Sequence, residues 1–90
     1  MAERNVYMAA LEKYGVHNQV NQLCEECAEL IVAVNHARRG RVGREEVISE
    51  LVDVAIMIEQ MKLVYGADEW ARVYAEKIGR LEIKIAEDAK

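Results

Sequence analysis

The chain has 90 residues, a net charge of −4 and no proline, and 52% of its residues are hydrophobic. A chain of this length forms a single domain and buries only about 60% of the surface that it exposes when unfolded. The acidic balance argues against nucleic acid as a partner, because nucleic-acid binders normally carry a basic surplus. No uninterrupted apolar run approaches the roughly 20 residues that span a bilayer, so we expect no membrane-spanning segment.

Two further features of the composition concern location and assembly. The N-terminal segment mixes Glu3 with Arg4 and lacks the apolar stretch of a signal peptide, so we expect a cytoplasmic protein. The apolar content is large for so short a chain, and we expect part of it to be buried against another copy. The sequence therefore predicts a homo-oligomer, either a dimer or a dimer of dimers (a tetramer).

Hydrophobic spacing in the first half of the chain predicts two helices. A short helix over residues 3–14 ends at Gly15, and a longer one follows over about 18–37. The second helix carries apolar residues at the spacing of a core stripe: Val20, Leu23, Cys24, Cys27, Ile31 and Val34. Beyond Cys27 its apolar residues spread around the whole circumference, which predicts burial on most sides.

The second half of the chain predicts two more long helices. The segment "RRGRVGR" at 38–44 breaks the pattern, a third helix runs over about 45–65, and Gly66 ends it. We expect Asp68 to cap a fourth helix that continues almost to the end of the chain. The fold class that follows is all-α, a bundle of one short and three longer helices that associates as a dimer or dimer of dimers.

Four acidic side chains stand in two matching pairs. Glu50 opens the apolar stretch "ELVDVAIMI" and Asp53 is set inside it, so that the two lie side by side on one helix surface. Glu26 and Glu29 repeat this spacing in "CEECAEL". An ionised carboxylate taken into an apolar interior loses several kcal/mol of hydration unless it is paired or binds a metal. Because the connection between the two helices is short, they should pack antiparallel and bring the two pairs together.

Such a cluster indicates a hard divalent cation. Like charges at close range cannot all remain ionised without a counter-charge, and carboxylate oxygens are the ligands that Mg²⁺ prefers, with Mn²⁺ as an alternative. Cys24 and Cys27 have the spacing of half a zinc site, but the chain has no second cysteine pair and no suitably spaced histidine to complete it. The other interpretation is that these glutamates form solvated helix faces, which applies most readily to Glu25, Glu45 and Glu46.

The order of these motifs resembles a known family. Gln19, "EECAEL" at 25–30 and "ELVDV" at 50–54 resemble the MazG-like nucleoside triphosphate pyrophosphohydrolases of the all-α NTP pyrophosphatase superfamily, whose signature is ExxE, a spacer and ExxD. The similarity extends over about residues 14–85, so residues 1–90 are expected to form a single MazG-like domain. The resemblance implies Mg²⁺-dependent hydrolysis of a (d)NTP to the (d)NMP and pyrophosphate.

The resemblance also implies roles for individual residues. It makes four carboxylates the metal ligands and catalytic residues: Glu26, Glu29, Glu50 and Asp53. Glu25 or Glu29 would accept a proton from the attacking water, and Gln19 would lie near the nucleotide. Lys77 and Arg80, which share a face of the last helix, would bind the triphosphate. A solvated basic face, with Glu76 and Arg80 paired one turn apart, explains the same cations.

Two other functions fit parts of the pattern. The related phosphoribosyl-ATP pyrophosphatases share the fold but usually carry Tyr-His soon after the ExxD-type aspartate, where this chain has apolar residues 54–58. A non-catalytic dimeric helical adaptor or regulator would explain the apolar surplus equally well, but it gives no reason for Asp53.

Overall fold

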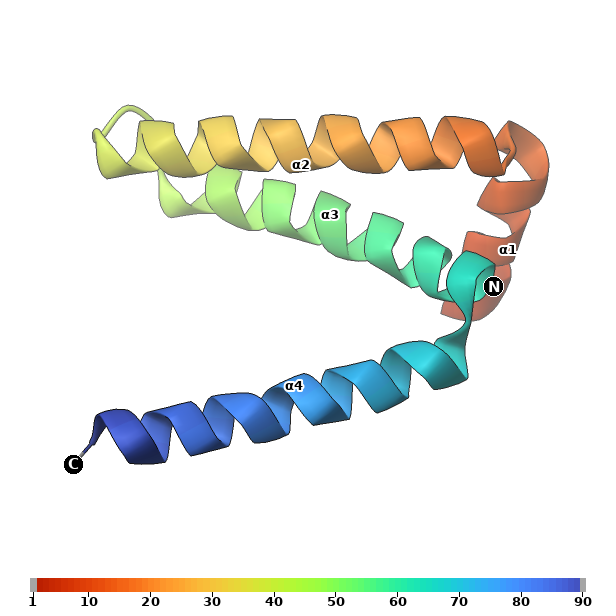
Figure 1. Cartoon of the computed structure of the whole chain (residues 1–90). Coiled ribbons are helices and arrows are strands. Elements are labelled where there is room, and N and C mark those ends of the chain that lie inside the picture. The colour runs from red at the N-terminus through yellow and green to blue at the C-terminus, as the bar shows by residue number, and fades with distance from the viewer. Residues whose placement is uncertain (1, 90) are drawn as a thin grey trace.

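The computed structural model of the chain describes residues 2–89 and consists of four α-helices (Figure 1). In chain order they are α1 (Glu3–Tyr14), α2 (Val16–Arg38), α3 (Arg44–Tyr65) and α4 (Ala67–Asp88). No strand occurs in the described range, so the predicted all-α class with one short and three longer helices is confirmed. None of these helices is both long enough and apolar enough to cross a bilayer.

The α2 and α3 helices form the centre of the molecule as an antiparallel pair joined by the short arginine-rich loop (Figure 1). Among the residues that the structure describes, the buried ones all lie on these two helices: Gln19, Ala33, Met57, Gln60 and Met61. The α1 helix packs against the end of the pair where α2 begins and α3 ends. The core is therefore small, and it includes two polar side chains among its five members.

Glycines make the two abrupt turns between successive helices. Gly15 and Gly66 have positive φ angles of 85° and 125°, a backbone region that other residues rarely adopt. The amide of Gly66 donates to the carbonyl of Lys62 at the end of α3, and α4 starts at the next residue. The prediction that Asp68 caps α4 is wrong, because Gly66 occupies the N-cap and Asp68 lies within the first turn. Its charge still suits the positive end of the helix dipole there.

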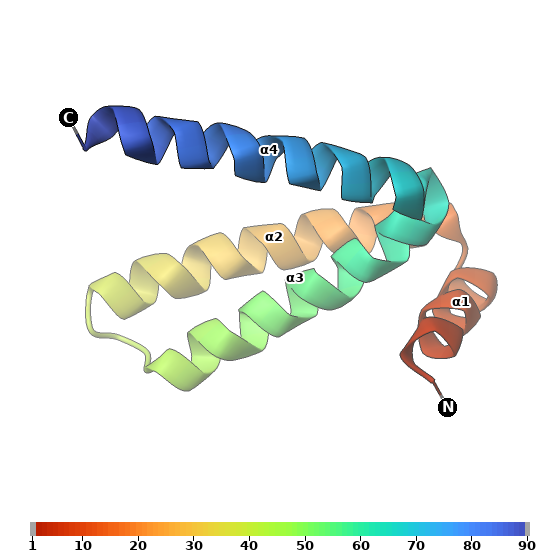
Figure 2. The ribbon, with the colours of Figure 1, turned by 90° about the horizontal axis from the view of Figure 1, so that it is seen from below.

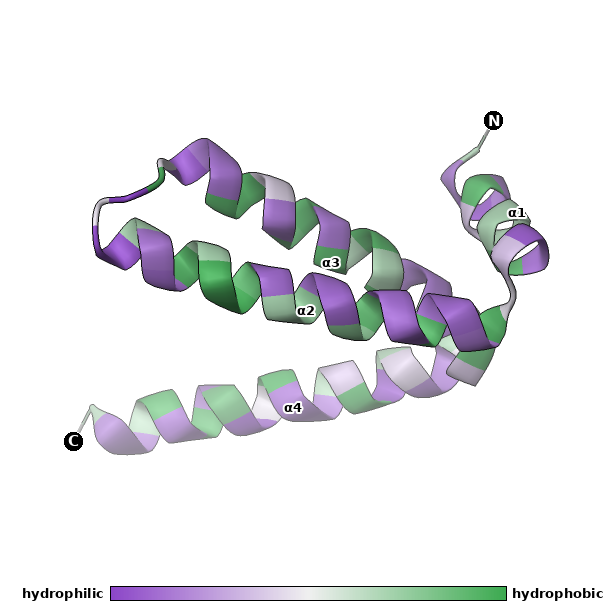
Figure 3. Cartoon of the chain, turned by 90° about the horizontal axis from the view of Figure 1, so that it is seen from above, coloured by the Kyte–Doolittle hydropathy of each residue, from purple (hydrophilic) through white to green (hydrophobic). Residues whose placement is uncertain are grey.

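The apolar stripe predicted for α2 is only partly buried within the chain. Ile31 and Val34 are 62% and 36% exposed, whereas Ala33 is buried, so the face turned towards α3 is displaced from the predicted one. The expectation that the second half of α2 is buried on most sides is not met by contacts within this chain. Figure 3 shows where hydrophobic residues occur along both helices, and several of them, such as Val32 and Leu51, are about half exposed.

The α4 helix diverges from the central pair (Figures 1 and 2). Among the described residues it packs only on α3, near Gly66, and none of its own residues is fully buried. Trp70 and Val73 are the half-buried side chains of this contact. The Trp70 ring meets the Tyr74 ring edge to face at a centroid distance of 5.2 Å, and Lys62 Nζ lies 5.1 Å from the Trp70 centroid.

Candidate functional site

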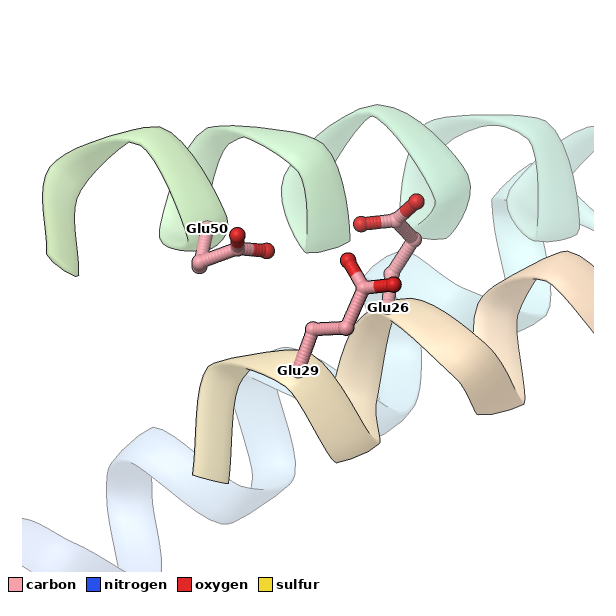
Figure 4. A group of neighbouring side chains, drawn as sticks. All are labelled: Glu26, Glu29 and Glu50. Atoms are coloured by element: carbon pink, nitrogen blue, oxygen red, sulfur yellow. The ribbon is translucent and has the colours of Figure 1, made fainter. Parts of the chain in front are cut away.

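Three glutamates from the central helix pair converge on one point. Glu26 and Glu29 on α2 and Glu50 on α3 each offer a carboxylate oxygen, and these three oxygens all lie within 4.8 Å of one another (Figure 4). The spacing of Glu26 and Glu29 puts both on one surface of α2, and the antiparallel packing of α3 brings Glu50 to the same place. The structure thus brings together three of the four carboxylates that the sequence predicted as a cluster.

The interior of this cluster is short of hydrogen-bond donors. One oxygen of Glu26 and one of Glu50, both named Oε2, are buried and accept no hydrogen bond from any residue in the described chain. The other oxygen of Glu26, Oε1, accepts a hydrogen bond of 2.7 Å from Gln22 Nε2, one turn earlier on α2. Gln22 therefore holds one oxygen of the Glu26 carboxylate, while the other stays buried without a donor.

The electrostatics of the cluster act most strongly on Glu50. Its pKa is raised above the usual value, first by burial and then by the negative charges of Glu29, Asp53, Glu26 and Glu46. Both causes disfavour the ionised form, because the carboxylate loses hydration and meets neighbouring charges of its own sign. None of the ion pairs in the described part of the chain involves a carboxylate of this cluster.

The donor set fits a hard divalent cation. Three carboxylates from two helices can surround one ion, and the unpaired Oε2 atoms of Glu26 and Glu50 are oxygen ligands that lack another partner. Exposed acidic groups often gather without an ion, but Glu26 and Glu50 are half-buried. Mg²⁺ or Mn²⁺ is therefore the cation that these residues suit best, since neither thiolate nor imidazole belongs to the group.

Asp53 and Glu25, the other predicted acidic residues, lie outside the group of three. Asp53 is half-buried on α3, one turn beyond Glu50, and close enough for its charge to raise the pKa of Glu50. Its apolar neighbours Leu51 and Val52 are both 49% exposed, so the setting of Asp53 within this chain is less apolar than the sequence suggested. Glu25 is exposed.

A shallow cleft of about 290 Å³ adjoins the carboxylates and extends towards the α2–α3 loop. Glu29 and Glu50 line one part of it, and the remaining lining is mainly apolar: Ala28, Val32, Ala33, His36, Val42 and Glu46. The sequence pattern predicted no role for His36 and a solvated position for Glu46. Their helical spacing could have placed both residues beside the carboxylates, since His36 lies two turns beyond Glu29 and Glu46 lies one turn before Glu50.

The remaining predicted site residues lie elsewhere. Gln19 is buried between α2 and α3, where its Nε2 donates a 2.7 Å hydrogen bond to Gln60 Oε1. Lys77 lines a separate groove between α3 and α4, and Arg80 is exposed on α4. Because α4 packs only on α3 in the described chain, neither cation approaches the glutamates of α2. Glu76 is paired with Arg72 at 3.0 Å, not with Arg80.

Comparison with known proteins gave no match, whether to a family model, to a curated protein or to a solved structure.

Proposed function

We propose that this chain is a Mg²⁺-dependent nucleoside triphosphate pyrophosphohydrolase, which converts a (d)NTP and water to the (d)NMP and pyrophosphate. The observation that carries the proposal is the meeting of Glu26, Glu29 and Glu50 within 4.8 Å, with two oxygen atoms buried and unpaired. The ordered ExxE and ExxD motifs, which resemble the MazG-like enzymes, supply the reaction class. We further propose that the enzyme acts in the cytoplasm as a homo-oligomer.

The carboxylates of Glu26, Glu29 and Glu50 would hold the cation, with Asp53 as a fourth ligand from the next turn of α3. When bound, a divalent ion neutralises phosphate charge and lowers the pKa of a coordinated water. Gln22 keeps the Glu26 carboxylate in place through its hydrogen bond to Oε1. These residues would therefore position the triphosphate beside the α2–α3 pair.

The attacking water needs a proton acceptor. Glu29 is the exposed member of the carboxylate group and also lines the adjoining cleft, so its position favours it over Glu25, which belongs to neither. The apolar part of the cleft, formed by side chains such as Val32, would shelter the rest of the nucleotide from water. Lys77 and Arg80 would reach the triphosphate only from another subunit, because α4 lies away from α2 in its own chain.

The test is to incubate the full-length chain with a panel of NTPs and dNTPs plus Mg²⁺ and to measure pyrophosphate and the nucleoside monophosphate. We expect equal amounts of both from at least one nucleotide, with no reaction in EDTA. Glu29→Gln should be inactive, and Glu12→Gln, which alters an exposed glutamate on α1, should match the unaltered chain. Release of orthophosphate would identify a different phosphate hydrolase. Absence of any product would favour a non-catalytic adaptor.

A further inference from the structure

The apolar side of α4 is uncovered along most of its length. Tyr74, Leu81 and Ile85 are 56%, 51% and 61% exposed, and every described residue from Tyr74 onwards is exposed except Gly79. Within residues 2–89 the helix packs only on α3, at the end that follows Gly66 (Figure 1). Figure 3 shows hydrophobic and hydrophilic residues alternating along α4, as expected for a helix with one apolar side.

The apolar residues of α4 follow a heptad repeat. Their separations alternate between four and three residues: Ala67, Ala71, Tyr74, Ile78, Leu81 and Ile85. We call these six residues the α4 seam. In heptad lettering Ile78 and Ile85 are at position a, and Leu81 is at position d. A seam of this period is the pattern by which one helix packs against another in a coiled coil.

The residue types select the number and the direction of the paired helices. Within parallel coiled coils, isoleucine at a combined with leucine at d favours two strands over three or four. Lys77 is at position g and Glu82 at position e, and neither forms an ion pair within the described chain. In a parallel pair a g side chain lies opposite the e side chain of the partner's following heptad, so Lys77 would meet Glu82 of the partner subunit.

An antiparallel pair would lack this complementarity. Position g then faces position g, which brings Lys77 and Lys84 towards the lysines of the other helix. Like charges at the edge of a seam disfavour that arrangement. The charges beside the α4 seam therefore select the parallel orientation, and the core residues select two strands.

We propose that α4 pairs in parallel and in register with α4 of a second copy of this chain, through the α4 seam. Trp70 and Val73 remain against α3, in a groove that Tyr74 and Lys77 also line. No seam residue beyond Tyr74 lines that groove, so each α4 can hold its own chain through its first turns and the partner from Ile78 onwards. The pair has the two-fold symmetry usual for homodimers. The inference rests on α4 alone and does not depend on the reaction proposed above.

Disulfide trapping tests the register. In a Cys24→Ser, Cys27→Ser background, which removes the two free thiols, Ile78→Cys and Ile85→Cys should each form a disulfide-linked dimer on mild oxidation. In a parallel pair in register, each residue of the seam faces the same residue of the partner at a distance that a disulfide can bridge. In an antiparallel pair, at most one of these two residues can face its own counterpart. Ile83→Cys is the control, because Ile83 is equally exposed but lies on the opposite side of α4. Linkage at Ile83, or at only one seam position, would overturn the proposal.

Charge reversal tests the pairing without disulfides. Glu82→Lys should raise the dimer dissociation constant about tenfold in sedimentation equilibrium, and the double variant Lys77→Glu, Glu82→Lys should restore it. Glu87→Lys, a reversal of the same charge outside the g and e positions, should leave the constant unchanged. A monomeric chain would overturn the proposal. So would a dimer whose dissociation constant is unchanged by Glu82→Lys.

Discussion

Gln19 on α2 donates a hydrogen bond from Nε2 to Oε1 of Gln60 on α3, at 2.7 Å, and both side chains are buried. This contact fixes the register of the antiparallel pair. Glu26 lies seven residues after Gln19, and Asp53 lies seven residues before Gln60, so the same register sets Glu26 opposite Asp53 two turns away. It likewise sets Glu29 opposite Glu50. A buried amide pair thus aligns the two helices that carry the carboxylates.

Removing one member of the amide pair should destabilise the chain. Gln60→Leu leaves the Gln19 amide buried without its acceptor, and we expect a loss of about 1–3 kcal/mol in the free energy of unfolding. The double variant Gln19→Leu, Gln60→Leu leaves no unpaired amide at this site and should lose less. Urea unfolding of the three proteins measures the difference. A double variant less stable than Gln60→Leu would contradict the role given to this contact.

Glu50 should make the metal-free protein less stable at neutral pH than in mild acid. Because the folded-state pKa of Glu50 is raised above the ordinary value of 4.5, the folded chain binds more protons than the unfolded chain between those two values. The free energy of unfolding contributed by this group therefore rises as the pH falls through the raised pKa. Glu50→Gln removes the titrating group, so in EDTA it should be more stable than the original chain at pH 7.

The advantage of Glu50→Gln should shrink as the pH approaches 4.5, since the original glutamate is then protonated as well. Urea unfolding of both proteins across this range gives the comparison, and Glu12→Gln is the control for an exposed carboxyl group. An advantage that stays constant with pH would show that Glu50 is not repelled by its neighbours.

Loss of a carboxylate charge in the cluster should abolish turnover without unfolding the chain. We expect Asp53→Asn and Glu29→Gln each to lower pyrophosphate release about a hundredfold or more, while the helical circular dichroism is retained. Because each change removes one repulsive charge, metal-free stability should be unchanged or higher. Turnover that survives in both variants would remove these two residues from the mechanism.

The cleft beside the carboxylates should bind the substrate beyond its phosphates. Val32 lines this cleft of about 290 Å³ and is half exposed, so Val32→Trp should fill the cleft without disturbing the core. We expect kcat/KM to fall about tenfold, mainly through KM, with Mn²⁺ binding unchanged. Ile31→Trp is the matched control, because Ile31 is exposed next to Val32 but does not line the cleft. Equal kinetics for the two variants would show that the cleft is not used.

The sequence predicted the helices well because their signals are local. Apolar periodicity places the four helices, and Gly15 and Gly66 mark two of their boundaries. The inward face of α2 was harder to predict. Apolar stripes normally face the core, yet here the polar residues Gln19 and Glu26 face α3, while Ile31 is left on the surface. Hydrophobicity alone cannot reveal a helix face that carries buried polar groups.

The carboxylate site was predictable in part, because the spacing of its glutamates along α2 is also a local signal. The i, i+3 spacing of Glu26 and Glu29, together with the short α2–α3 loop, was sufficient to expect their meeting with Glu50, and this convergence is confirmed. The positions of Lys77 and Arg80 depend on the direction in which α4 leaves Gly66, and no local pattern encodes that direction. Whether they reach a triphosphate remains a prediction that depends on a partner subunit.

Calorimetric titration of the metal-free chain with Mn²⁺ tests the central claim most directly. We expect one saturable site in the original chain, a large loss of affinity in Glu50→Gln, and unchanged affinity in Glu12→Gln, whose altered residue lies far from the cluster on α1. At one hundred times the dissociation constant, binding should also raise the free energy of unfolding by about 2.7 kcal/mol. Absence of binding, or binding that is equally strong in Glu50→Gln, would contradict the claim that these carboxylates gather around a divalent cation.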